Sequence, residues 1–267
     1  MNAYLSVLKL RLITGLQYRI AALAGVATQF SWGFLLIMVY EAFYAGATTA
    51  PPIGLKQLIT YIWLQEAFLI FIMLWFRDGE LFNLITSGNI AYELCRPCGL
   101  YGFWYAKLLA QRISGALLRC FPILIMALFL PEPYRLLLPP NPLALGLFLI
   151  TLILGLLVLV AISIFIYISV FITLSPAGSL LMFSVAGEFL GGNVIPVPLM
   201  PDWLRRIVYL LPFRLASDLP FRVYTGHIPP PEALEGIVAQ LVWLTLLVAL
   251  GNAALCRALR RVVVQGG

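Results

Sequence analysis

Charged residues and histidine are scarce in this chain of 267 residues. Only 10% of the residues are charged and 62% are apolar, whereas soluble domains average roughly 25% charged and 45–50% apolar residues. A soluble fold cannot bury so much apolar surface. Long windows with few or no charges predict transmembrane helices, because about 20 residues span a hydrocarbon core of about 30 Å. The composition therefore predicts an all-α integral membrane protein.

Residues that ligate metals are also few. The chain has one histidine and four cysteines. Cys95 and Cys98 form a C-x-x-C, but no second pair stands at zinc-ligand spacing, and His227 lies in a different loop. We interpret the two as incidental loop cysteines and expect no metal; the alternative is a redox or metal site.

Signatures of catalysis are missing too. The sequence contains neither G-x-x-x-x-G-K-[ST], which cradles ATP phosphates, nor H-E-x-x-H. We therefore expect a protein that is not an enzyme and binds no cofactor itself, so that it is passive, driven by a gradient or driven by another subunit. The net charge of +6 is spread over the ends of segments rather than gathered in a stripe, so no nucleic-acid partner is expected.

Six apolar segments are expected to cross the membrane within a single domain, 1–267, because no internal repeat stands out. The turn TLSPAG at 173–178 separates two of them. It is either a true turn or a kink in one continuous helix, since proline is tolerated in membrane helices. The expected spans are 20–45, 57–76, 103–130, 142–172, 176–191 and 234–255.

Residues 1–19 are expected to form an amphipathic helix on the membrane surface, and no removable signal peptide is expected. Its apolar positions are Leu5, Leu8, Leu10, Ile13 and Leu16. Basic residues cluster near the N-terminus, between spans two and three, and in the C-terminal tail, so the positive-inside rule makes these regions cytoplasmic. Both termini are then cytoplasmic. The basic residues are Lys9, Arg11, Arg19, Arg77, Arg96, Lys107, Arg257, Arg260 and Arg261.

The cytoplasmic loop 77–102 carries signals for two short helices. Asp78 suits the N-cap of the first and Gly88 its end, and a second helix near 90–95 stops before Pro97. We interpret the loop as a docking element for a cytoplasmic partner; the alternative is a helix resting on the bilayer. The apolar stripe of the first helix consists of Leu81, Phe82, Leu84 and Ile85.

The extracytoplasmic segment 192–233 is expected to be re-entrant or to lie on the surface before the last span, because its prolines break any continuous helix. A short amphipathic helix is predicted within it. Its apolar face would be Trp203, Ile207, Leu210 and Leu211, opposite Arg205 and Arg206.

Two ionisable residues are expected deep in the membrane. Glu66 lies near the middle of the second span and Arg112 in the third. A charge near the bilayer centre costs roughly 2.5–3.5 kcal/mol on insertion scales, so both should face protein or a wet cavity. They lie at similar depth, counted from opposite faces, and we expect them to pair. The alternative is that Glu66 contacts a substrate or relays a proton.

Three stretches resemble the type 2 export class of ABC transporter permeases, in the bacterial six-span group related to drug and peptide exporters. The first is the N-terminal surface helix. The second is ITSGNIAYELCRPCGLYGFW, with its Leu-x-Arg-Pro pattern, and the third is VIPVPLMPDWLRRIVYLLPFRLASDLPFRVYTGHI.

The resemblance implies a subunit of the bacterial cytoplasmic (inner) membrane that exports an amphipathic or hydrophobic compound or a peptide. Two permeases, identical or not, would lie in membrane lipid and associate with two ATP-binding subunits, which bind ATP and Mg. Carried over, the ATPase-coupling residues are Asp78, Glu80, Leu84, Ile85, Glu93 and Arg96. The translocation path and dimer interface would include Trp63, Glu66, Phe183 and Gly187.

Two other functions compete with this one. A gradient-driven secondary transporter would use an intramembrane acid such as Glu66 for coupling. A membrane assembly or anchor protein would bind a partner through the loop but form no path.

Overall fold

The computed structural model describes residues 2–17 and 19–260. Met1, Tyr18 and Arg261 lie outside the described residues, as does the rest of the C-terminal tail. No strand occurs in the described parts, which are all-helical. The helices are α1 (Asn2–Gly15), α2 (Arg19–Ala45), α3 (Leu55–Ala67), α4 (Leu69–Ile72), α5 (Gly79–Thr86), α6 (Ile90–Leu94), α7 (Leu100–Leu128), α8 (Pro142–Thr173), α9 (Pro176–Leu190), η1 (Val197–Leu199), α10 (Asp202–Leu210), η2 (Phe213–Leu215), α11 (Asp218–Tyr224) and α12 (Pro230–Leu259).

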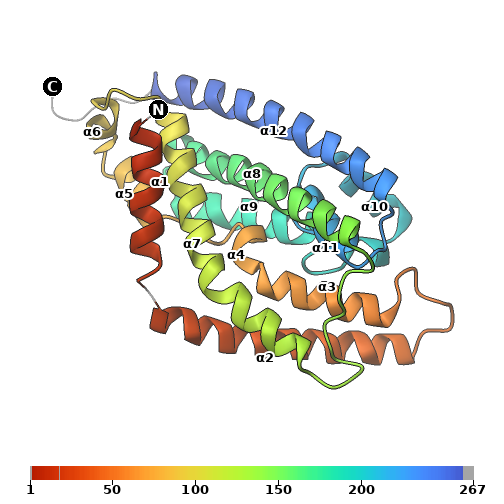
Figure 1. Ribbon diagram of the computed structural model, residues 1–267. Helices are drawn as coiled ribbons and strands as arrows, with labels where there is room; N and C mark the ends of the chain where they lie inside the picture. Colours follow the sequence, from red (N-terminus) through yellow and green to blue (C-terminus); the bar gives the residue numbers. More distant parts are fainter. Residues whose placement is uncertain (1, 18, 261–267) are drawn as a thin grey trace.

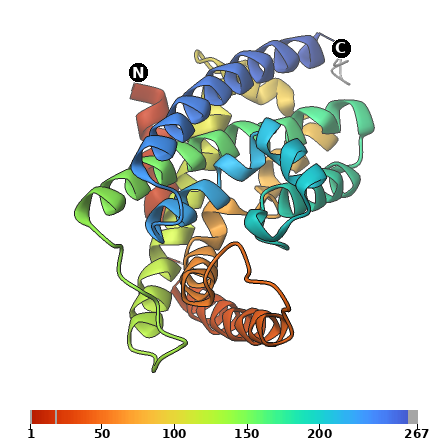
Figure 2. The ribbon, with the colours of Figure 1, turned by 90° about the vertical axis from the view of Figure 1, so that its right-hand side faces the viewer.

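The helices form an elongated bundle (Figure 1). The start of α1, the helices α5 and α6 and the end of α12 gather at one end, and α10 and α11 lie toward the other. Figure 2 views the same bundle from its right-hand side, with α2 and α3 below and α8 and α12 above them.

Four helices of the described residues are long and apolar enough to cross a membrane. They are α7, α8, α12 and the part of α2 from Ala22 to Ala45, and they correspond to the expected first, third, fourth and sixth spans. The protein is therefore embedded in a membrane and crosses it several times. The other two expected spans are shorter helices here, and α9 has only 15 residues.

Helix α8 is the core of the bundle, and α12, α11, α9, α5 and α7 all pack on it. It ends at the TLSPAG turn. Leu174 there has φ 50°, and the hydroxyl of Ser175 accepts a hydrogen bond of 3.2 Å from the backbone N–H of Gly178. A left-handed residue followed by an N-cap ends one helix and starts another. The turn is therefore real, and the continuous kinked helix is wrong.

The segment before the last span folds back into the protein. The predicted short helix is α10, but its buried residues are Leu204 and Val208, whereas Trp203, Ile207 and Leu210 of the expected apolar face are exposed. Every residue of α11 is buried. Gln240 of α12 fixes this segment, because its side chain donates hydrogen bonds of 2.8 Å to the carbonyls of both α8 and η2. Irregular backbone at such a position is tolerated where protein covers it.

Helix α1 packs along the first half of α7. The backbone N–H of Gly99 donates a 3.0 Å hydrogen bond to the hydroxyl of Tyr4. The expected single apolar face is wrong. Leu8 is partly buried, whereas Leu5, Leu10 and Ile13 are exposed. Apolar residues therefore surround α1, so one side binds α7 and the other is available to lipid.

The second expected span is broken, which corrects the prediction of one helix over 57–76. Helix α3 ends at Ala67, α4 adds one turn, and the chain is extended at Met73. Backbone carbonyls that leave a helix need other donors. The guanidinium of Arg112, which is 1% exposed, supplies them. Its bonds reach the carbonyls of Ile70 (2.8 Å), Met73 (2.8 Å) and Phe76 (3.4 Å), and Ser163 Oγ (3.0 Å).

The expected ion pair between Glu66 and Arg112 is therefore not formed. The guanidinium instead donates to the carbonyls of Ile70 in α4 and Met73 just after it. An arginine carries five N–H donors in a planar fork, so one side chain can satisfy several carbonyls. The backbone carbonyls compensate its charge here in place of a carboxylate.

We expect Arg112→Met to destabilise the protein strongly. It leaves three carbonyls without their donor, and each unsatisfied buried group costs about 1–3 kcal/mol. Thermal unfolding in detergent measures the effect. Ser163→Ala is the control, because it removes one of the four bonds and should cost about 1 kcal/mol. Equal unfolding midpoints for the two variants would show that the carbonyls do not depend on Arg112.

Candidate functional site

The loop after the broken second segment folds into two short helices, as predicted. Asp78 caps α5, because its Oδ1 accepts hydrogen bonds from the backbone N–H groups of Glu80 (2.9 Å) and Leu81 (3.3 Å). Gly88 follows the end of α5 with φ 75°, a conformation that favours glycine. Helix α6 then ends before Pro97. Local signals in the sequence were sufficient for these boundaries.

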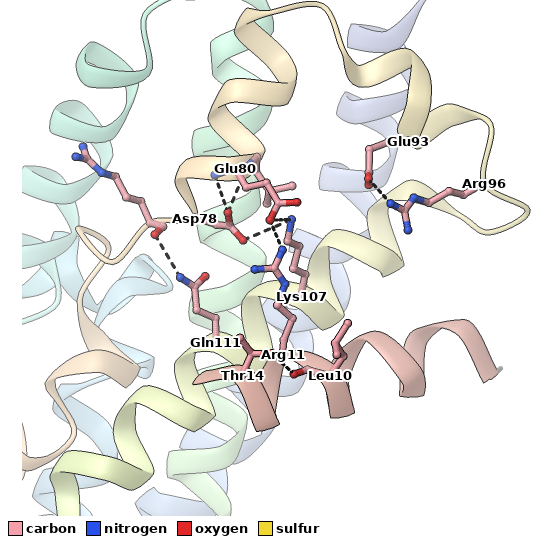
Figure 3. A network of polar contacts seen from close by, with 11 residues as sticks. Leu10, Arg11, Thr14, Asp78, Glu80, Glu93, Arg96, Lys107 and Gln111 are labelled. Atoms are coloured by element: carbon pink, nitrogen blue, oxygen red, sulfur yellow. Dashed lines mark hydrogen bonds and ion pairs between the residues drawn. The ribbon is translucent and has the colours of Figure 1, made fainter. Parts of the chain in front are cut away.

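Polar contacts fasten α5 to α1 and α7 (Figure 3), and one further hydrogen bond fastens it to α8. Lys107 Nζ of α7 lies 3.6 Å from Asp78 Oδ2 and 3.0 Å from Glu80 Oε2. Arg11 of α1 also pairs with Glu80. The backbone N–H of Asp78 donates a 2.8 Å hydrogen bond to the hydroxyl of Tyr167 in α8. We call these five residues the clamp: Arg11, Asp78, Glu80, Lys107 and Tyr167.

The electrostatics of the clamp are balanced. Lys107 is 3% exposed, and burying its charge is costly unless the ammonium is paired, which Asp78 and Glu80 do here. On Glu80, partial burial acts to raise the pKa, but hydrogen bonds and positive charge from Arg11 and Lys107 outweigh it and hold the pKa below its ordinary value. The two acids and two bases form one connected group. Displacing α5 would therefore strain α1, α7 and α8 together.

The apolar stripe of α5 faces inward. Leu81, Phe82 and Ile85 are buried, and the ring of Phe82 lies 4.6 Å from that of Tyr167, centroid to centroid. This stripe holds α5 against its own protein, so in this conformation it is free neither to dock a partner nor to rest on a bilayer.

Helix α6 carries the exposed apolar side chains of the loop. Tyr92 is 75% exposed and Leu94 46%. Beside them, Arg96 pairs with Glu93 at 2.9 Å and lies over the ring of Phe103, 4.7 Å from its centroid. Sequence reasoning missed Tyr92 and Leu94, because the sequence alone would place Glu93 at the surface and its apolar neighbours inside, the reverse of what the structure shows.

The expected coupling residues divide into two groups. Asp78, Ile85 and Glu93 are buried and position the helices. The remaining three are accessible to different degrees, and their contact with a partner stays a prediction: Glu80 and Arg96 are exposed and Leu84 is partly buried. Three clamp residues were not among the expected site residues: Arg11, Lys107 and Tyr167.

The four expected path residues are packed among neighbouring side chains in the described structure. Trp63 is fully buried, stacks on Phe30 at 5.1 Å and donates a 2.8 Å hydrogen bond to the carbonyl of Tyr134. Phe183 is partly buried in the cluster around α8, and Gly187 packs against Leu74. Their role in a path stays a prediction. In this conformation they contribute to packing.

Glu66 lies in a second polar cluster. It is 5% exposed, and its Oε2 finds no partner among the described residues. The side chain of Gln29 donates a 3.1 Å hydrogen bond to the backbone carbonyl of Glu66. Glu188 of α9 is close enough to Glu66 to interact with it electrostatically.

Within residues 2–17 and 19–260, no group of three or more His, Cys, Asp or Glu side chains is placed to hold a metal ion. Cys95 and Cys98 are both free thiols.

Comparisons of the chain with protein-family models, with curated proteins and with solved structures gave no match.

The clamp predicts a pH dependence of stability. Because the folded state lowers the pKa of Glu80, the stabilisation is fully present above the ordinary pKa of a Glu, about 4.3, and is lost as the pH falls through the lowered value. We therefore expect wild type to unfold at a higher temperature than Glu80→Gln at pH 7, with the gap closing below about pH 4. Circular dichroism in detergent measures both.

Glu235→Gln is the matched control for this titration, because Glu235 is exposed and makes no ion pair with a described residue. It should match wild type at every pH. A constant gap between wild type and Glu80→Gln from pH 7 to pH 3 would contradict the role assigned to the Glu80 carboxylate.

Proposed function

We propose that the chain is the permease subunit of an ATP-driven ABC exporter of the type 2 class. It lies in the inner membrane of a bacterium with both termini in the cytoplasm, and it crosses six times, counting α3 with α4 and α9 beside the four long helices. It pairs with a second permease and with two ATP-binding subunits. Its cargo is an amphipathic or hydrophobic compound or a peptide.

The observation that carries this proposal is the clamped loop. The helices α5 and α6 lie at the end of the bundle where α1 begins and α12 ends (Figure 1). Ion pairs fasten α5 to α7, and a hydrogen bond fastens it to α8. The neighbouring α6 exposes Tyr92 and Leu94. The pair α5 and α6 thus combines a helix fixed to the bundle with an exposed apolar surface, an arrangement that suits coupling to a moving partner.

The mechanism follows from this linkage. ATP binding draws two ATP-binding subunits together, and subunits that hold α6 move it with them. The clamp transmits this displacement to α1, α7 and α8, because separating its buried charges would cost several kcal/mol of free energy, on the order of 3–5 kcal/mol for a broken buried pair. Rigid-body shifts of packed helices then open the path at the interface between permeases.

We expect Tyr92→Ser combined with Leu94→Ser to release the ATP-binding subunits, because it removes the exposed apolar surface of α6. Affinity purification from native membranes in mild detergent, followed by identification of the co-eluting chains, measures this. The ATP-binding subunit should co-elute with wild type and fall at least fivefold with the variant.

Leu138→Ser is the control. Leu138 is 73% exposed and lies in the loop between α7 and α8, and its replacement should leave the co-elution unchanged. If wild type brings down no chain with an ATP-binding motif, the proposal fails. If it brings down another membrane chain only, the assembly or anchor function is favoured.

A gradient-driven secondary transporter is the second candidate, and the Glu66–Glu188 cluster favours it. Intramembrane acids that lack a cationic partner are typical coupling sites for protons or cations. No lysine or arginine of the described residues forms an ion pair with Glu66.

Glu66→Gln separates the two functions in reconstituted vesicles. Under the proposed function, transport needs ATP and the partner subunit, and we expect the variant to retain at least half of it. Under a gradient-driven mechanism, the protein transports alone and Glu66→Gln abolishes transport, because the coupling acid is lost. Glu235→Gln should be silent in both assays.

A further inference from the structure

A cavity of about 310 Å³ opens where α1 ends and α2 begins, beside the middle of α7. Figure 1 shows the three helices meeting there. Five polar side chains line the cavity: Arg11, Thr14, Gln111, Ser114 and Arg119. The remaining wall is largely apolar and includes Ile70, Phe76 and Leu118. The clamp and the proposed path do not account for this space.

The cavity is lined by positive charge and by no acidic side chain. Two guanidinium groups line it, and no carboxylate does. Arg11 uses Nη2 for Glu80. Arg119 is partly buried and makes neither an ion pair nor a hydrogen bond with any described residue. An arginine is suited to binding a planar or tetrahedral oxyanion through several N–H groups at once.

Arg119 belongs to the second half of α7, yet it lies beside the first turns of α2. Its guanidinium lies against the backbone of α2 at Gly25, where an added Cβ would approach Arg119 Cζ to 2.6 Å. Gly25 is six residues into α2, which corresponds to about 9 Å at 1.5 Å per residue. Arg119 therefore lies close to the start of α2 rather than beside the middle of that helix.

Exposed apolar side chains flank the residues that line the cavity. Ile20 and Leu23 of α2 are 86% and 65% exposed, and Phe121 of α7 is 57% exposed. In a membrane these surfaces face acyl chains. A positively charged cavity beside them matches a molecule with an anionic head and a hydrocarbon tail.

We propose that this cavity binds the phosphate of an anionic phospholipid headgroup, with Arg119 as its main ligand and Arg11 as a second. Thr14, Gln111 and Ser114 provide further hydrogen-bonding groups, and the acyl chains run over the exposed faces of α2 and α7. The lipid holds α1 against α2 and α7 at the end of the bundle. This site depends only on the protein being embedded in a membrane and is independent of the transport function.

The test measures binding of phosphatidylglycerol to the purified full-length protein in detergent, by native mass spectrometry and by the shift in unfolding temperature. Phosphatidylglycerol should bind wild type and raise the unfolding temperature, whereas zwitterionic phosphatidylcholine should do neither. Sodium phosphate distinguishes a free anion from a lipid. If phosphate stabilises wild type as well as phosphatidylglycerol does, the assignment to a lipid is overturned.

We expect Arg119→Gln to weaken phosphatidylglycerol binding about tenfold, because it removes the principal charge-assisted contact. Arg119→Lys keeps the positive charge but loses the planar guanidinium. Its affinity for phosphatidylglycerol should lie between those of wild type and Arg119→Gln. Arg135→Gln, on an exposed arginine that pairs with Glu132 in the loop after α7, should bind like wild type. If Arg119→Gln does not fold, the binding of phosphatidylglycerol and of phosphatidylcholine to wild type still tests the proposal. Equal binding of both lipids overturns the proposal.

Discussion

The buried guanidinium of Arg112 holds the fold together where the second segment leaves its helix. An apolar environment offers no water to backbone carbonyls, so a break in a membrane helix needs donors from protein. Arg112 bonds the carbonyls of Ile70, Met73 and Phe76 and also the hydroxyl of Ser163 in α8. One side chain thus satisfies the break and links α7 to α8. The extended chain that follows leads to α5.

Helix α7 organises the end of the bundle through successive polar residues. Lys107 joins the clamp, Gln111 donates to the carbonyl of Arg77, Arg112 supports the break, and Arg119 faces the cavity. These positions lie within about 18 Å along one helix, at 1.5 Å per residue. A force on the loop therefore reaches the broken segment and the start of α2 through a single rigid element.

The clamp and the cavity illustrate two ways of placing charge near lipid. In the clamp, acids and bases compensate each other, and the buried Lys107 is neutralised within the protein. Around Arg119, no acid of the described residues does so, and compensation has to come from outside the chain. Glu66 is a third arrangement, a buried acid that forms no ion pair with the described residues.

Hydropathy, caps and turn residues determined the existence and the approximate limits of most helices. Asp78, Gly88 and Ser175 act on their own neighbours, so their effects could be predicted locally. Residue count, at 1.5 Å per residue, also suggested a similar depth for Glu66 and Arg112. It did not fix which way a side chain points around the helix axis. Only the packing of α7 against α4 decided that Arg112 binds carbonyls and not Glu66, and only the packing of α5 on α8 turned its apolar stripe inward, because contacts between distant segments set those rotations.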